Sequence, residues 1–245
     1  MKYPALLVDT SSRHLIFARL DSATSGEVLR ALPEARSEDA IDNAVAKLFE
    51  RVEDIGEIWL GEGPGSFVGL RSSFAYVRML VMLAGKPCRT FFSSRLWRAL
   101  FGIEPDAWLL TRTNARLFYG DRFTTERETL VVDIAAEGQR PRGDVYCFAD
   151  TWLSAAPAQK DGHSIDQPGD RTGAAASAAE PGSQASRRHD AVQADWKYLT
   201  IGDARLAAGA LTPENLALTQ PKSATDLNPI YGHELNFTLA KGNNG

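Results

Sequence analysis

The sequence is poor in the residues that build disulfide scaffolds and metal sites. It has two cysteines, Cys88 and Cys147, whose spacing indicates neither a disulfide framework nor a zinc site. No two of its four histidines stand four residues apart, so a helical metal-binding pair is excluded; they are His14, His163, His189 and His233. We therefore expect no metal site in this chain and a reduced, cytoplasmic compartment.

Long apolar runs and a charge excess of one sign are also missing. No run approaches the roughly 20 apolar residues of a membrane span, and the opening Met1–Pro4 lacks the apolar stretch of a signal peptide. We expect no membrane partner. The formal net charge of −4 gives no general attraction to phosphate backbones. A nucleic-acid partner would need a local basic patch or a second protein.

The common catalytic motifs are incomplete. The glycine-rich stretch 61–65 is not followed by Lys-Ser or Lys-Thr, which excludes a P-loop, and it does not follow G-x-G-x-x-G spacing. Ser66 is not in a G-x-S-x-G nucleophile elbow, since Val68 stands where the second glycine belongs. No catalytic residue is predicted, and these absences favour a binding subunit over an independent enzyme.

The glycine-rich stretch joins a short apolar strand, Ile58–Leu60, to a predicted helix. Ser66 is a suitable N-cap for that helix. The helix should end near Ala84, because Gly85 suits the position after a helix and Pro87 stops its continuation.

Two interpretations of the turn remain open. It is either a phosphate cradle, formed by Gly63, Gly65 and Ser66 at the positive end of the helix, or a tight connection in which glycine relieves crowding.

The predicted helix is apolar nearly all round. From Phe74 to Ala84 its only charge is Arg78. A surface helix of a globular protein carries one apolar stripe, so this pattern indicates burial on more than one side. The second covering would be another domain or another chain.

Gly63–Arg71 resembles the G-P-G-S-F-T-G-L-R signature of the TsaB (YeaZ) family, with Val68 in place of threonine. Three shorter stretches follow the family's order. Leu7–Ser11 resembles its opening L-A-x-D-T-S and Asn114–Tyr119 its D-A-R-R-x-x-x-Y. Pro229–Tyr231 resembles its closing P-x-Y-x-R, although Gly232 and His233 stand where the arginine is expected.

The resemblance implies the two-lobed sugar-kinase/actin-like (ASKHA) α/β fold, in which each lobe is a mixed sheet with flanking helices. We assign residues 1–101 to the first lobe and 102–245 to the second, with a low-complexity insert near 154–194. The residue pattern predicts strands over 5–9, 14–20, 27–32, 88–92, 108–112, 117–123, 129–135, 145–149 and 196–202, and helices over 37–52 and 94–101.

The resemblance also implies site residues. In this superfamily the turn at Asp9, Thr10 and Ser11 approaches nucleotide phosphate; the alternative is an Asx or serine turn that closes a hairpin. The helices of the first lobe face the partner in TsaB-like proteins. The predicted partner interface is Leu70, Arg71, Phe74, Val77, Arg78 and Val81.

A TsaB-like chain is a non-catalytic subunit that pairs with a TsaD-like enzyme and supports threonylcarbamoyl transfer to the tRNA adenosine next to the anticodon. The other implied partners are a TsaE-like ATPase, a synthase that supplies threonylcarbamoyl-adenylate, and tRNA through the complex. ATP and metal would belong to the complex, not to this chain, and a homodimer is implied for the chain alone.

TsaD-type enzymes carry an H-x-x-x-H metal pair that is missing here.

The alternative function is a stand-alone nucleotide-dependent small-molecule kinase of the same superfamily. Such a kinase needs a catalytic aspartate near Asn114, and an amide cannot act as a general base. A glycoprotease-type hydrolase is a third possibility, which no nucleophile–base–metal constellation supports.

Overall fold

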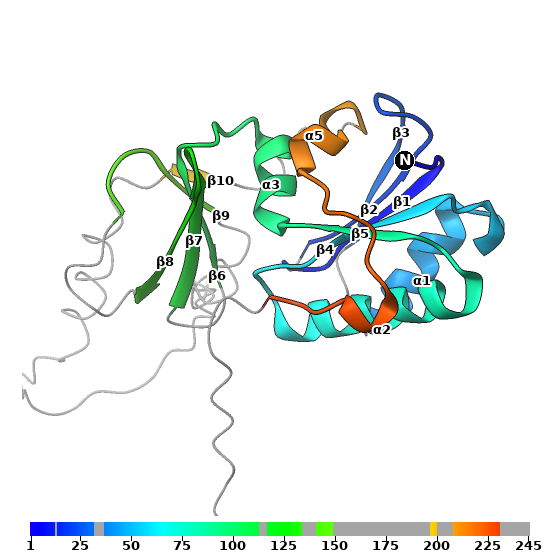
Figure 1. The fold of residues 1–245 in the computed structure, drawn as a ribbon. Coiled ribbons are helices and arrows are strands. Elements are labelled where there is room, and N and C mark those ends of the chain that lie inside the picture. Colours follow the sequence, from blue (N-terminus) through cyan, green and yellow to red (C-terminus); the bar gives the residue numbers. More distant parts are fainter. Residues whose placement is uncertain are drawn as a thin grey trace, which may run out of the picture.

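The computed structural model describes residues 1–12, 14–31, 37–112, 117–133, 141–148, 197–199 and 208–230, and shows two five-stranded sheets side by side (Figure 1). The predicted insert near 154–194 and the turn at 113–116 lie outside the described residues. The division into lobes at residues 101 and 102 stays a prediction.

The first sheet has the strand order β3-β2-β1-β4-β5. Strands β1 (Ala5–Asp9), β2 (Leu15–Leu20) and β3 (Gly26–Ala31) correspond to the first three predicted strands and form an antiparallel meander. Strands β4 (Glu57–Gly61) and β5 (Cys88–Phe91) continue the sheet in parallel with β1. Successive side chains of a strand point to opposite faces, and β1, β2 and β4 are apolar at nearly every position. Both faces of this sheet must therefore be covered.

One face is covered by α1 (Ser37–Leu48) and α2 (Phe67–Ala84). Helix α2 has the predicted ends: Ser66 Oγ accepts from Gly69 N, and Gly85 has a φ of 61° in the left-handed region. Helix α1 ends four residues before the predicted Val52, which begins a separate 3₁₀ turn, Val52–Asp54. The core on this side includes Leu6, Val8, Phe17, Ile41, Leu60, Leu70, Phe74 and Val77.

The other face packs against α3 (Ser93–Phe101), the short helix α5 (Pro213–Leu216) and the second sheet. Its core joins Leu7, Ile16, Trp59 and Phe91 of the first sheet to Leu109 of the second sheet. Trp97 and Leu100 of α3, Leu216 of α5 and Leu211, which precedes α5, complete it. The two sheets are thus held together by a shared apolar core.

The second sheet has the order β10-β9-β6-β7-β8. Strands β6 (Trp108–Arg112) and β7 (Leu117–Phe123) have the predicted bounds. Strand β8 (Arg127–Asp133) begins two residues earlier than predicted, and the last two residues of that prediction, 134 and 135, lie outside the described residues. Strands β9 (Val145–Phe148) and β10 (Lys197–Leu199) pair in parallel.

After α5 the chain returns to the first sheet as an extended segment, residues 218–230, which we call the C-terminal strap (Figure 1). Thr219 N donates to Thr90 O at 2.9 Å, and Lys222 N donates to Cys88 O at 2.7 Å. A 3₁₀ turn, Ala224–Asp226, lies against α2. The strap therefore covers β5, the edge strand of the first sheet.

Candidate functional site

The glycine-rich loop packs directly on the turn that follows β1. Ser66 N donates to Ser11 O at 2.6 Å. A Cβ atom at Gly65 would lie 2.1 Å from Ser11 O, and one at Gly69 would lie 2.2 Å from Thr10 O. Side chains at these two positions would collide with backbone, so glycine is required here by close packing.

The loop uses its backbone groups within the chain. Gly63 N donates to Ser93 Oγ at 3.0 Å, and Ser93 N donates back to Gly63 O at 2.9 Å. Glu62 N donates to Phe91 O, and Ile230 N from the strap donates to Glu62 O. These contacts favour the tight-connection interpretation of the loop. Nucleotide binding by Gly63, Gly65 and Ser66 stays a prediction.

The Asp9 turn is tied to the same corner. Asp9 is fully buried, and its Oδ1 accepts from Ser11 N at 3.0 Å and from Ser11 Oγ at 2.7 Å. Burial raises the pKa of the Asp9 carboxyl, and hydrogen bonds from Ser11 and Ser93 oppose that rise. Thr10 Oγ1 donates to Ser73 Oγ at 2.7 Å, which joins the turn to α2. Asp9, Thr10 and Ser11 thus lie beside the loop, in a closed and fully packed arrangement.

The predicted interface residues lie on different sides of α2. Leu70, Phe74 and Val77 are at most 2% exposed and face the sheet. Arg78 is directed to the strap, where its guanidinium donates to Leu227 O. Of the six predicted residues, Arg71 is exposed and Val81 is half-buried.

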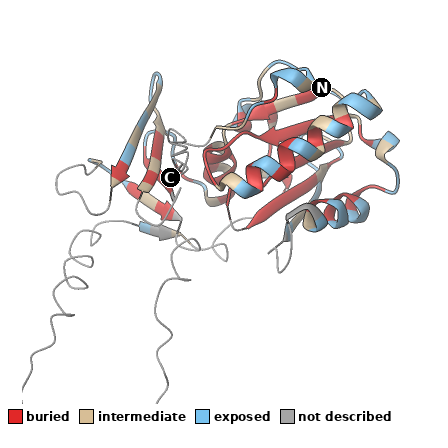
Figure 2. Cartoon of the chain, turned by 90° about the horizontal axis from the view of Figure 1, so that it is seen from below, coloured by how far each residue is buried: buried red, intermediate tan, exposed pale blue. Residues whose placement is uncertain are grey.

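Exposed apolar residues follow the opposite side of α2, with the exposed Arg71 between the first two of them. We call this stripe the outer face; it consists of Val68, Ala75, Met79, Met82 and Leu83. The four large members are 64%, 44%, 73% and 81% exposed, in chain order. They are four of the six exposed large hydrophobic residues among those described. Figure 2 shows this helix from its outward side, where exposed residues alternate with buried ones.

The spacing of these residues explains the stripe. Positions 68, 75, 79 and 82 are separated by seven, four and three residues, which places them on one side of a helix. The sequence shows that α2 is apolar all round. It does not show which side of the helix the sheet covers, so it does not predict the outer face.

Helix α2 is also long and apolar enough to cross a membrane by length and composition, with a mean hydropathy of 1.4. Its inner side nevertheless packs on the sheet through Leu70, Phe74, Val77 and Leu80. That packing is typical of a core helix.

Titratable groups suited to metal binding do not cluster in the described part of the chain, where no three His, Cys, Asp or Glu residues come together. Cys88 and Cys147 are both buried. Burial raises the pKa of the Cys88 thiol to about 12, so it stays protonated and unreactive at neutral pH.

Comparison with known proteins places the fold. No family model matches the sequence, and no curated protein matches it. Among solved structures, YeaZ from Pseudomonas aeruginosa aligns over 93% of this chain and 98% of its own, with a TM-score of 0.55 and 14% identity. An uncharacterized protein with similarity to peptidase YeaZ, from the same organism, covers 61% of this chain and 76% of its own at a TM-score of 0.48 and 16% identity.

The likeness to YeaZ extends over nearly the whole chain, and it confirms the predicted fold class. The protein has the two-lobed ASKHA-like fold, with two mixed sheets and flanking helices.

Proposed function

We propose that this chain is a non-catalytic, TsaB-like subunit that pairs with a TsaD-like enzyme through the outer face of α2. In that complex it supports threonylcarbamoyl transfer to the tRNA adenosine next to the anticodon. The carrying observation is the exposed apolar stripe of α2. The stripe begins within Gly63–Arg71, the stretch that resembles the TsaB signature, and the chain shares the fold of YeaZ.

The outer face has the properties of a contact surface. Contiguous apolar side chains on a monomer often mark protein–protein contacts. Burying a large apolar side chain contributes about 1.5–3 kcal/mol, so Val68, Met79, Met82 and Leu83 together could drive association. Methionine, which supplies two of these four, adapts its shape to a partner surface.

The same face accounts for a homodimer of the isolated chain. A helix surface that is apolar and self-complementary can pair with its own copy around a two-fold axis. We propose that the TsaD-like subunit displaces that copy, because both would occupy the outer face.

The packing of the glycine-rich loop supports a non-catalytic role. In ASKHA kinases this corner approaches nucleotide phosphate, whereas here Gly63, Gly65 and Gly69 are in close contact with the chain's own backbone. We therefore assign ATP and metal to the complex, with the TsaE-like ATPase and the TsaD-like subunit as their carriers.

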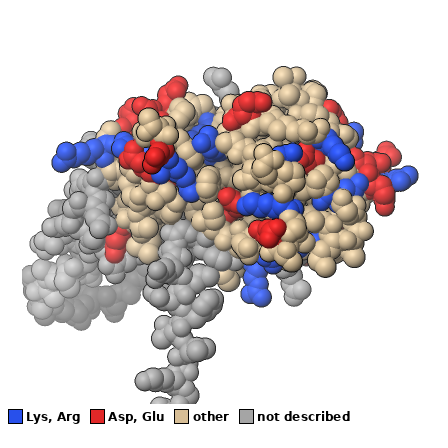
Figure 3. All heavy atoms as spheres, viewed as in Figure 1, with Lys and Arg blue, Asp and Glu red and all other residues tan. Residues whose placement is uncertain are grey.

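Surface charge supports recognition of tRNA through the complex. The net charge is −4, and on the face seen in Figure 3 basic and acidic side chains alternate with no large basic patch. Binding of RNA backbone relies on clustered Lys and Arg. The partner would therefore supply most of the basic surface.

Substitution of Met82 tests the pairing. Met82 is 73% exposed, so Met82→Asp should leave the fold intact and place a charge within the contact, near the C-terminal end of α2. We expect the affinity for a TsaD-like protein from the same organism to fall at least about tenfold. Light scattering after size-exclusion chromatography detects the complex, and calorimetry measures its affinity.

Val131 provides the matched control. It is an exposed apolar residue on β8, 43% exposed against 44% for Met79, and it lies outside α2. Val131→Asp should pair like the wild type. Equal pairing of the wild type and Met82→Asp would remove the assigned interface. Absence of any complex, together with ATP turnover by the chain alone, would replace the proposal with the kinase alternative.

A further inference from the structure

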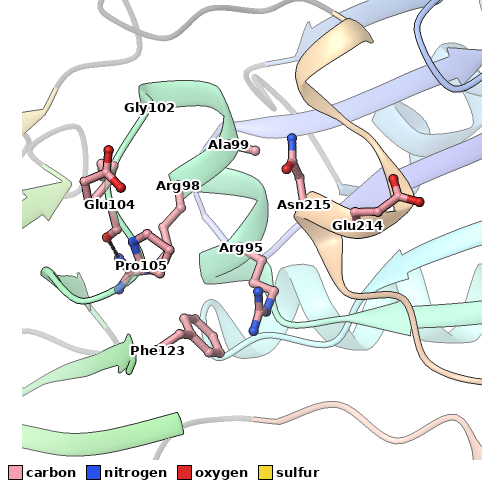
Figure 4. A pocket seen from close by; sticks show the side chains of 10 residues that line it. Arg95, Arg98, Ala99, Gly102, Glu104, Pro105, Phe123, Glu214 and Asn215 are labelled. Carbon is pink, nitrogen blue, oxygen red and sulfur yellow. Dashed lines mark hydrogen bonds between the residues drawn. The ribbon is translucent and has the colours of Figure 1, made fainter. Parts of the chain in front are cut away.

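A pocket of about 450 Å³ lies between the two lobes, where α3, the end of β7 and α5 meet (Figure 4). Its walls include Arg95 and Arg98 of α3, Phe123 of β7 and Asn215 of α5. None of its lining residues belongs to the glycine-rich loop or to the outer face of α2. Its volume is typical of small-molecule sites.

Arg98, the more buried of the two arginines in the pocket wall, already has an ion-pair partner. Arg98 is 6% exposed and donates to Glu104 O at 2.9 Å and to Asp121 O at 2.6 Å. The buried Asp121 carboxylate accepts from Ser94 Oγ and lies 3.4 Å from Arg98 Nη2 and 3.5 Å from Arg127 Nη2. One carboxylate therefore serves two guanidinium groups, which leaves one positive charge in this cluster. Glu104 and Glu214 also line the pocket, and among the described residues neither forms an ion pair with these guanidinium groups.

Arg95 adds a third guanidinium without an anionic partner. It is half-buried, and its Cζ lies 3.8 Å from the centre of the Phe123 ring. Its backbone N–H donates to Phe92 O, but among the described residues its guanidinium makes no hydrogen bond or ion pair. Burial lowers the pKa of Arg95, Asp121 raises it and Arg127 lowers it further, yet an arginine remains charged at neutral pH. Figure 4 shows its guanidinium beside Phe123, with the Glu214 carboxylate directed away from it.

A half-buried cation next to two others is unfavourable unless an anion joins it. Its planar fork of donors matches the paired oxygens of phosphate and carboxylate groups. We propose that this pocket binds a small organic anion, whose phosphate or carboxylate group contacts Arg95 and whose remainder fills the cavity beside Phe123. The site is independent of the pairing surface on α2.

Calorimetry with three probes, inorganic phosphate, AMP and citrate, tests this at constant ionic strength. We expect at least one probe to bind the full chain, and its affinity to fall about tenfold in Arg95→Gln. Arg51→Gln, which removes an arginine 67% exposed on the surface, should leave the affinity unchanged. A preference for AMP identifies a phosphate ligand, and a preference for citrate identifies a carboxylate.

A second variant covers the case in which Arg95→Gln does not fold. Ala99 lines the same pocket and is partly exposed, so Ala99→Glu adds a negative charge to its wall. It should abolish binding of the same probe. The proposal is overturned if none of the three probes binds the wild type, or if the folded variants at residues 95 and 99 bind as the wild type does.

Discussion

Asp9 is a carboxyl group held entirely inside the protein. It is fully buried beside the glycine-rich loop, and burial raises its pKa above the ordinary value of 3.8. A raised pKa means that the folded state holds the proton more tightly than the unfolded state. The resulting stabilisation is fully present below the unfolded pKa and is lost as pH rises through the folded one.

Asp9→Asn should remove this dependence. Asparagine keeps an acceptor for Ser11 and carries no charge to desolvate. We expect the melting temperature at pH 7 to rise by about 2–4 °C, which for a chain of this size corresponds to roughly 1 kcal/mol, and the gain to vanish near pH 4. Melting curves from pH 4 to 8 measure it.

Asp21→Asn serves as control for loss of one exposed carboxylate, whose side chain is 50% exposed. A rise in melting temperature for Asp9→Asn that is the same at every pH would contradict its assignment to the cost of burying the charged Asp9 carboxylate.

At the scale of one element, the sequence of the glycine-rich loop is compatible with both a phosphate cradle and a tight connection. A phosphate cradle and a tight connection both need glycine at the same positions. What separates them is whether a ligand or the chain's own backbone lies against Gly65, and here it is Ser11. That contact joins residues 54 positions apart, so no local pattern contains it.

Gly65→Ala should therefore be destabilising by about 1–3 kcal/mol, since its Cβ would lie 2.1 Å from Ser11 O. Urea unfolding monitored by tryptophan fluorescence measures the change. Gly209→Ala is the matched control, because the nearest atom to its Cβ is 3.6 Å away at Thr24 O. A Gly65→Ala variant as stable as Gly209→Ala would show that the loop can move aside.

Helix α2 could be predicted to the residue, whereas its two sides could not. Ser66 and Gly85 are local signals for its ends. The assignment of Phe74 to the core and Met82 to the surface depends on where the sheet lies. Helix α5 was missed because four residues give no periodicity, although Thr212 as N-cap and Pro213 after it are a usable signal.

At the scale of the whole molecule, the fold class could be predicted because the nine-residue stretch Gly63–Arg71 resembles the TsaB signature, and that resemblance implies the fold. The pocket between the lobes could not. Arg95, Arg98 and Phe123 come from α3 and β7, and neither segment carries a binding motif in the sequence. Such a site exists only after the sheets have packed together.

The shared core predicts that the two sheets depend on each other. Leu109 lies on β6 and packs with residues of the first sheet, whereas Phe118 of β7 packs within the second sheet. Each substitution to alanine should cost about 2–5 kcal/mol. In amide hydrogen exchange, Leu109→Ala should lower protection in both β1 and β6, and Phe118→Ala in the second sheet first. Loss confined to the second sheet in both variants would contradict a shared core.

The C-terminal strap has a consequence for the order in which the protein is made. Cys88 of β5 pairs with Lys222 of the strap, and the ribosome must synthesise 134 further residues after Cys88 to reach Lys222 (222 − 88). During that interval the edge of the first sheet is open to pairing with other chains. The first lobe therefore begins to form first but receives its last strand pairing at the end of synthesis. A chaperone that binds nascent chains would have to protect the edge of β5 for this whole interval.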